Sequence, residues 1–393
     1  MDTVIIDWLN LAVRWFHVVA GIAWIGASFY FIWLDLNLRQ PPQWKLDKGM
    51  KGDLWAIHGG GIYEVGKYRL RPDVMPEKLH WFKWEAYTTW LSGTGLLILL
   101  YYLQAQSYLV GNDSWIHSPG WAIGASIAYI ALGQLAYEVL LRTPLVKRGL
   151  VFAGALLVLI GLASWLAQNL FSGRAAYLHV GAMIATWMAG NVYWGIIPAQ
   201  KKFVAAVSAN REPDLATALF AKLRSTHNNY LTLPVIFCML SNHYPFLYGH
   251  PHAWLVLLAI GALLAWGRHY FNLKHRGIRK PGILVGSGIG LIIVAILSST
   301  LGRPSLSVES VEAVTSDEIT ALITTHCTGC HARNPSQPGF NAPPAGLVID
   351  DAESLLASKA RSAPAIRSGY MPLGNMTELT DEQRNALLVW LEQ

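Results

Sequence analysis

Eight stretches of about 20 predominantly apolar residues occupy the first 302 residues of this chain, and each can cross a hydrocarbon core about 30 Å thick as a helix. Only 14% of the residues are charged, where about 25% is typical of soluble proteins. The composition therefore excludes an ordinary cytoplasmic globule, a disordered chain and a collagen-like chain. The stretches are residues 15–36, 84–104, 120–141, 149–170, 176–197, 229–248, 253–272 and 281–302.

The charges of the connecting loops predict the orientation of the chain. Loops 39–83, 142–149, 198–228 and 268–280 contain 22 Lys and Arg residues, whereas the loops on the other side contain one, Arg174. Basic loops stay on the cytoplasmic side of a membrane. We therefore predict a multi-pass protein of the bacterial inner membrane with both termini outside, in the periplasm. The excess of basic residues is then explained by the orientation of the chain in the membrane, and no nucleic acid partner is expected.

The C-terminal part differs from the rest in composition. Residues 304–393 carry 5 Lys and Arg against 11 Asp and Glu, whereas residues 1–303 carry 25 against 13. The long apolar runs also stop near Leu301. We therefore divide the chain into a membrane domain, a linker and a small soluble periplasmic domain. Their predicted bounds are 1–302, 303–315 and 316–393.

The soluble domain contains the sequence Cys-Thr-Gly-Cys-His at residues 327–331, which has the spacing that attaches c-type haem. The thiols of Cys327 and Cys330 can reach the two vinyl groups of one porphyrin, and His331 can then bind its iron. A disulfide or a zinc site is the alternative. Zinc normally needs a second ligand pair, and His326 is the only obvious extra donor.

Met371 is the predicted second axial ligand of this haem, because Pro372 restricts the loop that presents its sulfur. Met376 is the alternative. A helix capped by Ser316 should precede the haem motif, and a last helix over about 380–391 should pack across it. The predicted fold class is therefore all-α: an eight-helix transmembrane bundle followed by a small soluble class I cytochrome c-like domain.

Two histidines lie inside predicted membrane helices, where polar groups are costly and usually functional. His17 begins the segment HVVAGIAW and His179 begins the similar segment HVGAMIAT. The similarity indicates either a parallel repeat of four plus four helices or chance. The two histidines are candidate ligands of a b-type haem, although each could simply hydrogen-bond to a neighbouring helix.

A second polar group is predicted at the cytoplasmic face. The segment HGGGIYEVGKYRLRP supplies His58 and Lys67, and the segment THNNYLTLP supplies His227, Asn228 and Asn229. Three glycines let backbone N–H groups approach a ligand, and Asn amides can hydrogen-bond to a planar heterocycle. Taken singly, these residues could equally be loop charges or helix caps. As a set, they predict a site for a polar and possibly anionic substrate.

These two segments, together with HWFKWEAYTTWLSG, GRHYFNLKHRGI and the C-terminal C-x-x-C-H module, resemble the bacterial membrane-bound urate oxidases, also called urate hydroxylases. The resemblance implies oxidation of urate with water to 5-hydroxyisourate in purine catabolism. It also implies that electrons pass to the fused cytochrome c, and on to a soluble cytochrome or a terminal oxidase, without hydrogen peroxide. The first helix faintly resembles that of small membrane protoporphyrinogen oxidases, which favours His17 as a haem ligand.

The same residues also suggest a mechanism, and they leave alternative functions open. His227 or His58 could act as the base, and Lys67 could stabilise the urate anion. A substrate near the cytoplasm would lie about one membrane thickness from the periplasmic haem, so an intramembrane redox centre or a deeper substrate site is needed. The alternative functions are a membrane-anchored cytochrome c electron conduit and a quinol oxidoreductase with no purine substrate.

Overall fold

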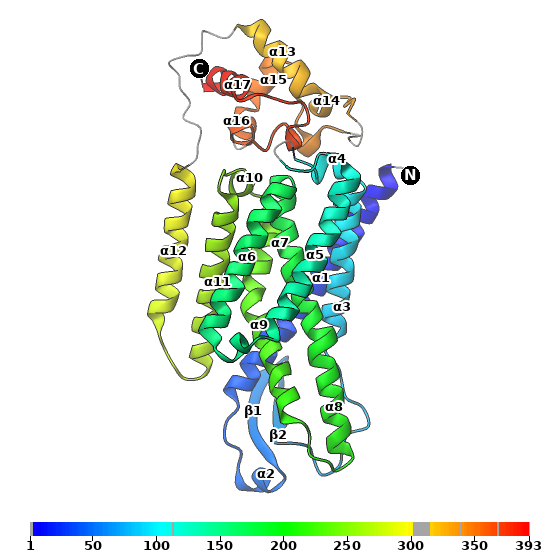
Figure 1. Cartoon of the computed structure of the whole chain (residues 1–393), viewed down its shortest axis with the longest axis vertical. Coiled ribbons are helices and arrows are strands. Elements are labelled where there is room, and N and C mark those ends of the chain that lie inside the picture. The colour runs from blue at the N-terminus through cyan, green and yellow to red at the C-terminus, as the bar shows by residue number, and fades with distance from the viewer. Residues whose placement is uncertain are drawn as a thin grey trace.

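The computed structural model of the chain describes residues 3–111, 114–301, 315–337, 340, 342–367 and 369–392. The chain forms an elongated helical bundle that has a β-hairpin at one end and a small helical module at the other (Figure 1). These ends are termed the hairpin end and the module end. The predicted linker 303–315 lies, apart from Thr315, outside the described residues.

Long helices build the bundle, and two of them continue through π-helical turns, η1 after α3 and η3 between α7 and α8. Short helices α2, α4 and α10 lie in the connections. The bounds are α1 Thr3–Asn37, α2 Gln43–Asp47, α3 Trp84–Leu97, η1 Ile98–Tyr102, α4 Ala105–Tyr108, α5 Pro119–Leu141, α6 Gly149–Leu170, α7 Gly173–Gly190, η3 Asn191–Ile196, α8 Ile197–Ser208, α9 Leu215–Ser241, α10 Pro245–Tyr248, α11 Ala253–His275 and α12 Pro281–Thr300.

Six helices in the described part of the chain are long and apolar enough to cross a membrane: α1, α5, α6, the continuous α7–α8 helix, α11 and α12. Their outward faces expose large apolar side chains, among them Leu150, Val158 and Leu162 of α6. Such a continuous apolar surface is unfavourable in water and suits contact with lipid. The remaining two predicted stretches correspond to α3 with η1 and to α9, which also run along the bundle (Figure 1).

The boundaries of α9 correct the predicted span 229–248. The helix begins at Leu215, where the Asp214 carboxylate caps it by accepting from the backbone N–H groups of Ala216 and Thr217, and it ends at Ser241. Hydropathy misplaced the helix because its first half is polar. Among those polar residues, Arg224 and Asn228 are buried against other helices of the bundle, so they do not contact the surrounding solvent.

A two-stranded antiparallel hairpin corrects the all-α expectation. Strand β1 (Met50–His58) pairs with β2 (Gly61–Tyr68), and only Gly59 and Gly60 join them. Their φ angles are 57° and 80°, the positive values at both central positions that a type I′ turn requires and that glycine adopts without strain. The glycine run thus closes a hairpin and does not form a ligand cradle.

The C-terminal module has a small core of its own. Ile319 and Ile323 of α13 pack with Leu387, Leu388 and Leu391 of α17, as predicted for the first and last helices. The described helices of the module are α13 Ser316–His326, α14 Thr328–His331, α15 Ala352–Ala357, α16 Lys359–Arg367 and α17 Asp381–Glu392.

The cap of α13 is Thr315 and not the predicted Ser316. Its hydroxyl accepts from the N–H of Glu318, and the Glu318 carboxylate accepts from the N–H of Thr315. This reciprocal pair is a capping box, which satisfies two N–H groups at once.

The module rests on the end of the bundle opposite the hairpin (Figure 1). Tyr248 of α10 and Tyr370 of the module meet edge to face, with ring centroids 6.2 Å apart. The hairpin and the module are therefore separated by the full length of the bundle.

Candidate functional site

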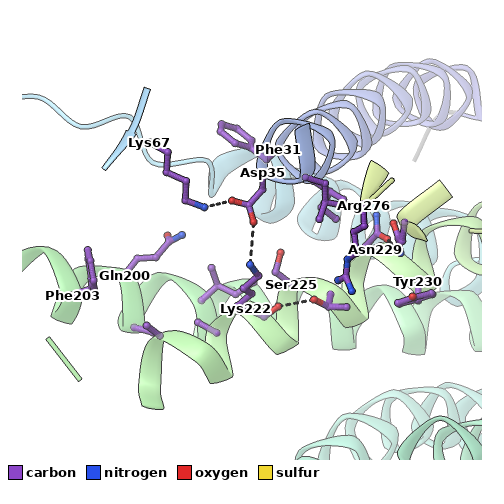
Figure 2. A pocket seen from close by; sticks show the side chains of 18 residues that line it. Phe31, Asp35, Lys67, Gln200, Phe203, Lys222, Ser225, Asn229, Tyr230 and Arg276 are labelled. Atoms are coloured by element: carbon purple, nitrogen blue, oxygen red, sulfur yellow. Dashed lines mark hydrogen bonds and ion pairs between the residues drawn. The ribbon is translucent and has the colours of Figure 1, made fainter. Parts of the chain in front are cut away.

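A cavity of about 550 Å³ lies near the hairpin end of the bundle, among α1, α8, α9, α11 and the end of β2 (Figure 2). It is termed the hairpin-end cavity. Most of its wall is apolar, and polar side chains from several elements converge on it. The charged and amide groups are Asp35, Lys67, Gln200, Lys222, Asn229, Asn272 and Arg276.

The Asp35 carboxylate joins three elements at the cavity. It accepts from Lys67 of β2 and, at 3.1 Å, from Lys222 of α9 (Figure 2). Two ammonium groups against one carboxylate leave a positive charge, to which the exposed Arg276 adds. A partly enclosed basic cavity favours an anionic ligand.

Two amides form the deeper wall. The Oδ1 atom of Asn229, which is fully buried, accepts from Asn272 Nδ2 at 2.8 Å and from Arg268 Nε at 3.3 Å. Asn229 Nδ2 and Asn272 Oδ1 have no hydrogen-bond partner in the part of the chain that the structure describes. An unpaired buried polar group costs about 1–3 kcal/mol. One free donor beside one free acceptor is suited to the edge of a heterocycle.

A separate buried network holds α9 against α5 and η3. Arg224 of α9 donates to both oxygens of Glu138, at 2.6 and 2.7 Å, and to Asn191 Oδ1 at 3.0 Å. Asn191 Nδ2 donates to Asn228 Oδ1 at 2.8 Å and to the Tyr137 hydroxyl at 2.9 Å. Asn191 lies in the π-helical turn η3, a type of distortion that is frequent at functional sites.

The structure brings some of the predicted site residues to the hairpin-end cavity and separates others. Lys67 and Asn229 line it. His227 and Asn228 do not, because successive residues of an α-helix point about 100° apart and only the face with Asn229 meets the cavity. Asn228 instead donates to the Met188 carbonyl. His58 is exposed at the hairpin turn and is not part of the cavity wall.

The sequence contained one overlooked signal for this region. Glu138 lies in the apolar stretch 120–141, and an ionisable residue there is a functional-site candidate by default. Its partner Arg224 was counted among the loop charges. Asp35 lies in the apolar stretch 15–36 and carries the same signal, whereas Lys222 and Asn272 join the cavity only through helix packing.

The predicted pair His17 and His179 is not assembled as a bis-histidine site. His17 Nδ1 contacts the Thr89 carbonyl and the Ser92 hydroxyl of α3. His179 Nδ1 donates to the Ala175 carbonyl at 2.7 Å, and its Nε2 is 2.6 Å from the Ser126 hydroxyl of α5. Both ring nitrogens of His179 are therefore engaged, and the two histidines contact different helices. This arrangement does not fit a b-type haem.

The motif in the module retains the groups that covalent haem needs. Cys327 and Cys330 are free thiols, and burial raises the pKa of Cys327 to about 11. His331 is buried, and its Nδ1 donates to the Leu347 carbonyl at 2.9 Å, which leaves Nε2 as the ligating nitrogen. The described residues contain neither a disulfide at the motif nor a group of three potential zinc ligands. This donor set fits a c-type haem.

The backbone of Met371 is held on both sides. Its N–H donates to the Ala365 carbonyl at 3.0 Å, and its carbonyl accepts from Arg384 at 2.7 Å. Met376 follows in the next turn, at the end of the short 3₁₀ helix over residues 373–375. The Met376 N–H donates to the Leu373 carbonyl at 3.2 Å, so the backbone of each methionine is hydrogen-bonded.

Comparison with known proteins gives one result. The sequence model of a family described as "Urate oxidase N-terminal" matches residues 3–299, which include the whole bundle and the hairpin. No curated protein and no solved structure matches the chain.

Proposed function

The chain belongs to the urate oxidase family that this match defines, and we propose that it oxidises urate in the hairpin-end cavity and passes the electrons to a c-type haem in the module. Family membership indicates an oxidoreductase that acts on urate. The observation that carries the choice of site is the pair of unpartnered amide atoms, Asn229 Nδ2 and Asn272 Oδ1, beside a cluster of cations.

Urate matches the polar groups of this cavity. It is a planar heterocycle that carries carbonyl acceptors next to N–H donors and is an anion near neutral pH. Asn229 Nδ2 donates to a ring carbonyl, and Asn272 Oδ1 accepts from the neighbouring ring N–H. Lys67, Lys222 and Arg276 stabilise the negative charge. Binding of urate thus gives both free amide atoms a partner.

The reaction removes two electrons and two protons from urate, and water then adds at C5 to give 5-hydroxyisourate. The new oxygen comes from water, and hydrogen peroxide is not a product because the two electrons go to the module and not to O₂. Asp35 is the carboxylate of the cavity and is the proposed acceptor for a proton of the substrate or of water. Lys67 and Lys222 hold the Asp35 carboxylate in place through their hydrogen bonds to it. His58, which is exposed at the hairpin turn, has no part in this mechanism.

Asn228 and His227 contribute from behind the cavity as positioning residues. Their hydrogen bonds to Asn191 and Tyr137 fix the rotation of α9 about its own axis. That rotation is what presents Asn229 to the substrate.

The proposed membrane topology adds α3 with η1 and α9 to the six apolar helices, giving eight spans. The basic loops then lie with the hairpin on the cytoplasmic side of a bacterial inner membrane, and the module lies in the periplasm. A reporter enzyme fused after Gln393 should be active only if it is a periplasmic type.

The module supplies the electron acceptor. Cys327 and Cys330 would attach the haem, and His331 and Met371 would be its axial ligands. A c-type haem held in this way provides a one-electron acceptor. A soluble cytochrome or a terminal oxidase of the respiratory chain would take the electrons onward.

The test uses membranes from a host that attaches c-type haem and has no other urate oxidase. Adding urate should reduce the c-type haem, produce 5-hydroxyisourate and form no hydrogen peroxide. Asn229→Leu should lower this rate, whereas the matched Asn242→Leu should not, because the Asn242 amide donates to the Met239 carbonyl near the module end and does not line the cavity. If quinol reduces the haem and urate never does, the electron-conduit alternative holds instead.

A further inference from the structure

A second cavity of about 580 Å³ lies on another face of α9, between α6 and α11. It is termed the α6–α11 groove. Its wall is apolar except toward the hairpin end, where His227, Tyr230 and His269 meet. Thr226 and Tyr230 line both the groove and the hairpin-end cavity. A molecule in the groove would therefore be separated from bound urate by one helix.

The buried network fixes the proton of His227. Arg224 donates to Asn191 Oδ1, so the Asn191 amide must donate through Nδ2 to the Tyr137 oxygen. The Tyr137 hydroxyl then donates to His227 Nδ1, 3.0 Å away. A neutral imidazole that accepts at Nδ1 carries its hydrogen on Nε2. That N–H has no partner among the described residues, and it belongs to a side chain that lines the groove.

His269 repeats this arrangement on the facing helix α11. Its Nδ1 shares a hydrogen bond of 2.6 Å with the Tyr230 hydroxyl, so its Nε2 is also left without a partner among the described residues. Phe152 of α6 stacks on His227 at 4.8 Å, with an interplanar angle of 13°, and restrains the ring. The apolar groove therefore ends in two imidazoles whose outer nitrogens are available to a ligand.

A ligand in this lipid-facing groove must provide hydrogen-bond partners for the two outer nitrogens. A hydrocarbon chain alone would leave the His227 N–H unpaired, at a cost of about 1–3 kcal/mol. A charged head group would have to be desolvated among the apolar side chains of α6, α9 and α11. A planar, uncharged head group with carbonyl acceptors and an apolar tail meets both conditions.

We infer that the α6–α11 groove binds a lipid-soluble quinone, with its carbonyl oxygens toward His227 and His269 and its tail along α6 and α11. The inference rests on the proposed function. It supplies an electron carrier between the hairpin-end cavity and the module, which lie at opposite ends of the bundle (Figure 1). Urate, water and quinone give 5-hydroxyisourate and quinol. Both quinone carbonyls become hydroxyls, with the two electrons from urate and two protons released from urate and water. Two successive one-electron transfers to the module would then return the quinol to quinone and release its two protons to water.

The first test measures binding without urate. Equilibrium binding of decyl-ubiquinone to the full-length holoprotein should be saturable, and His227→Leu should weaken it about tenfold, the effect of one lost hydrogen bond. Gly261→Leu should abolish binding because the new side chain fills the groove, and it leaves the polar network intact. A Cβ at this position has only Pro234 nearby, at 3.8 Å, so the backbone can accept the substitution. His243→Leu, at an exposed position near the module end, is the matched control.

The second test measures electron transfer. Urate should reduce the haem of the quinone-depleted holoprotein at least tenfold more slowly than that of the replete protein, and decyl-ubiquinone should restore the rate. Full-rate reduction in depleted protein, or binding by both groove variants equal to that of His243→Leu, would overturn the inference. Co-purification of phospholipid alone would also overturn it. Absence of 5-hydroxyisourate in intact membranes would instead refute the proposed function, and the binding test would be unaffected.

Discussion

Arg224 and Glu138 form a two-point ion pair inside the bundle, although 86 residues separate them in the sequence. The pair ties α9 to α5, and Asn191 extends it to η3. The guanidinium is 6% exposed and the carboxylate 16% exposed, so neither charge is well hydrated. The pair therefore fixes where α9 sits, and with it which residues reach the hairpin-end cavity.

Removing one member of this pair should destabilise the protein strongly. Glu138→Leu leaves the Arg224 charge buried and unpaired, with an expected loss of about 3–5 kcal/mol. The double replacement Glu138→Leu with Arg224→Met should recover much of that loss, because it leaves no unpaired charge. Thermal unfolding in detergent measures both. A single variant as stable as the double variant would contradict the role of the pair.

The two amides of the cavity should control substrate affinity. Asn229→Leu and Asn272→Leu should each raise the KM for urate about tenfold, the effect of one hydrogen bond to the substrate. The rate at saturating urate should fall less, because neither amide takes part in proton transfer. Steady-state kinetics separates the two effects. A KM unchanged in both variants would exclude this wall as the urate site.

Asp35 should affect the chemical step. Asp35→Asn keeps the size of the side chain and removes its ability to accept a proton, so kcat should fall about 100-fold or more. Asp47→Asn is the control, since Asp47 accepts from Gln43 on α2 and lies outside the cavity wall. Product formation under saturating urate is the measurement. Equal rates for the two variants would show that another group accepts the proton.

The two methionines of the module should behave differently. Met371→His exchanges a thioether ligand for an imidazole and should lower the reduction potential of the haem. Met376→Leu should leave that potential unchanged. A redox titration of the c-type absorption band in the full-length protein decides the matter. If only Met376→Leu shifts the potential, the axial ligand is Met376.

The capping box of α13 should make its first turn sensitive to acid. Hydrogen bonds from the backbone N–H and the hydroxyl of Thr315 lower the pKa of Glu318 below its usual value. Their stabilisation is therefore present above about pH 4.5 and is lost as the pH falls through the lowered pKa. The hydrogen-exchange protection factors of residues 316–320 in the full-length protein, which correct for the slower intrinsic exchange in acid, should fall over that range.

The variant Thr315→Ala tests the same cap at neutral pH. It removes the side chain that caps α13, which should cost about 1 kcal/mol of local stability. Protection factors in the first turn should then be low already at neutral pH, and acid should change them less. Equal exchange in the variant and the parent protein would show that the capping box does not limit fraying of this helix.

Local sequence patterns determined the elements that depend only on nearby residues. The apolar stretch 149–170 coincides with α6, because a membrane-length apolar run satisfies its own backbone as a helix whatever surrounds it. The last helix of the module was placed to within one residue. The C-x-x-C-H motif could be recognised from spacing alone, because its two thiols and its imidazole lie within five consecutive residues.

Patterns that depend on context were misread. The run of glycines near His58 suggested a ligand cradle and forms a hairpin turn, since both uses require the same backbone freedom. The first half of α9 was assigned to a loop because hydropathy counts a polar residue in the same way whether it faces water or another helix.

Apolar runs and local spacing in the sequence thus predict a bundle of apolar helices with a cysteine-histidine module, and basic loops at alternate ends of the helices. Packing between helices determines that Asn229 lines a cavity with Asp35 and Asn272, whereas His227, two residues earlier, lines a different groove. Helical rotation and the packing of α9 against α5 and η3 set these directions, and both depend on contacts between residues that are far apart in the chain.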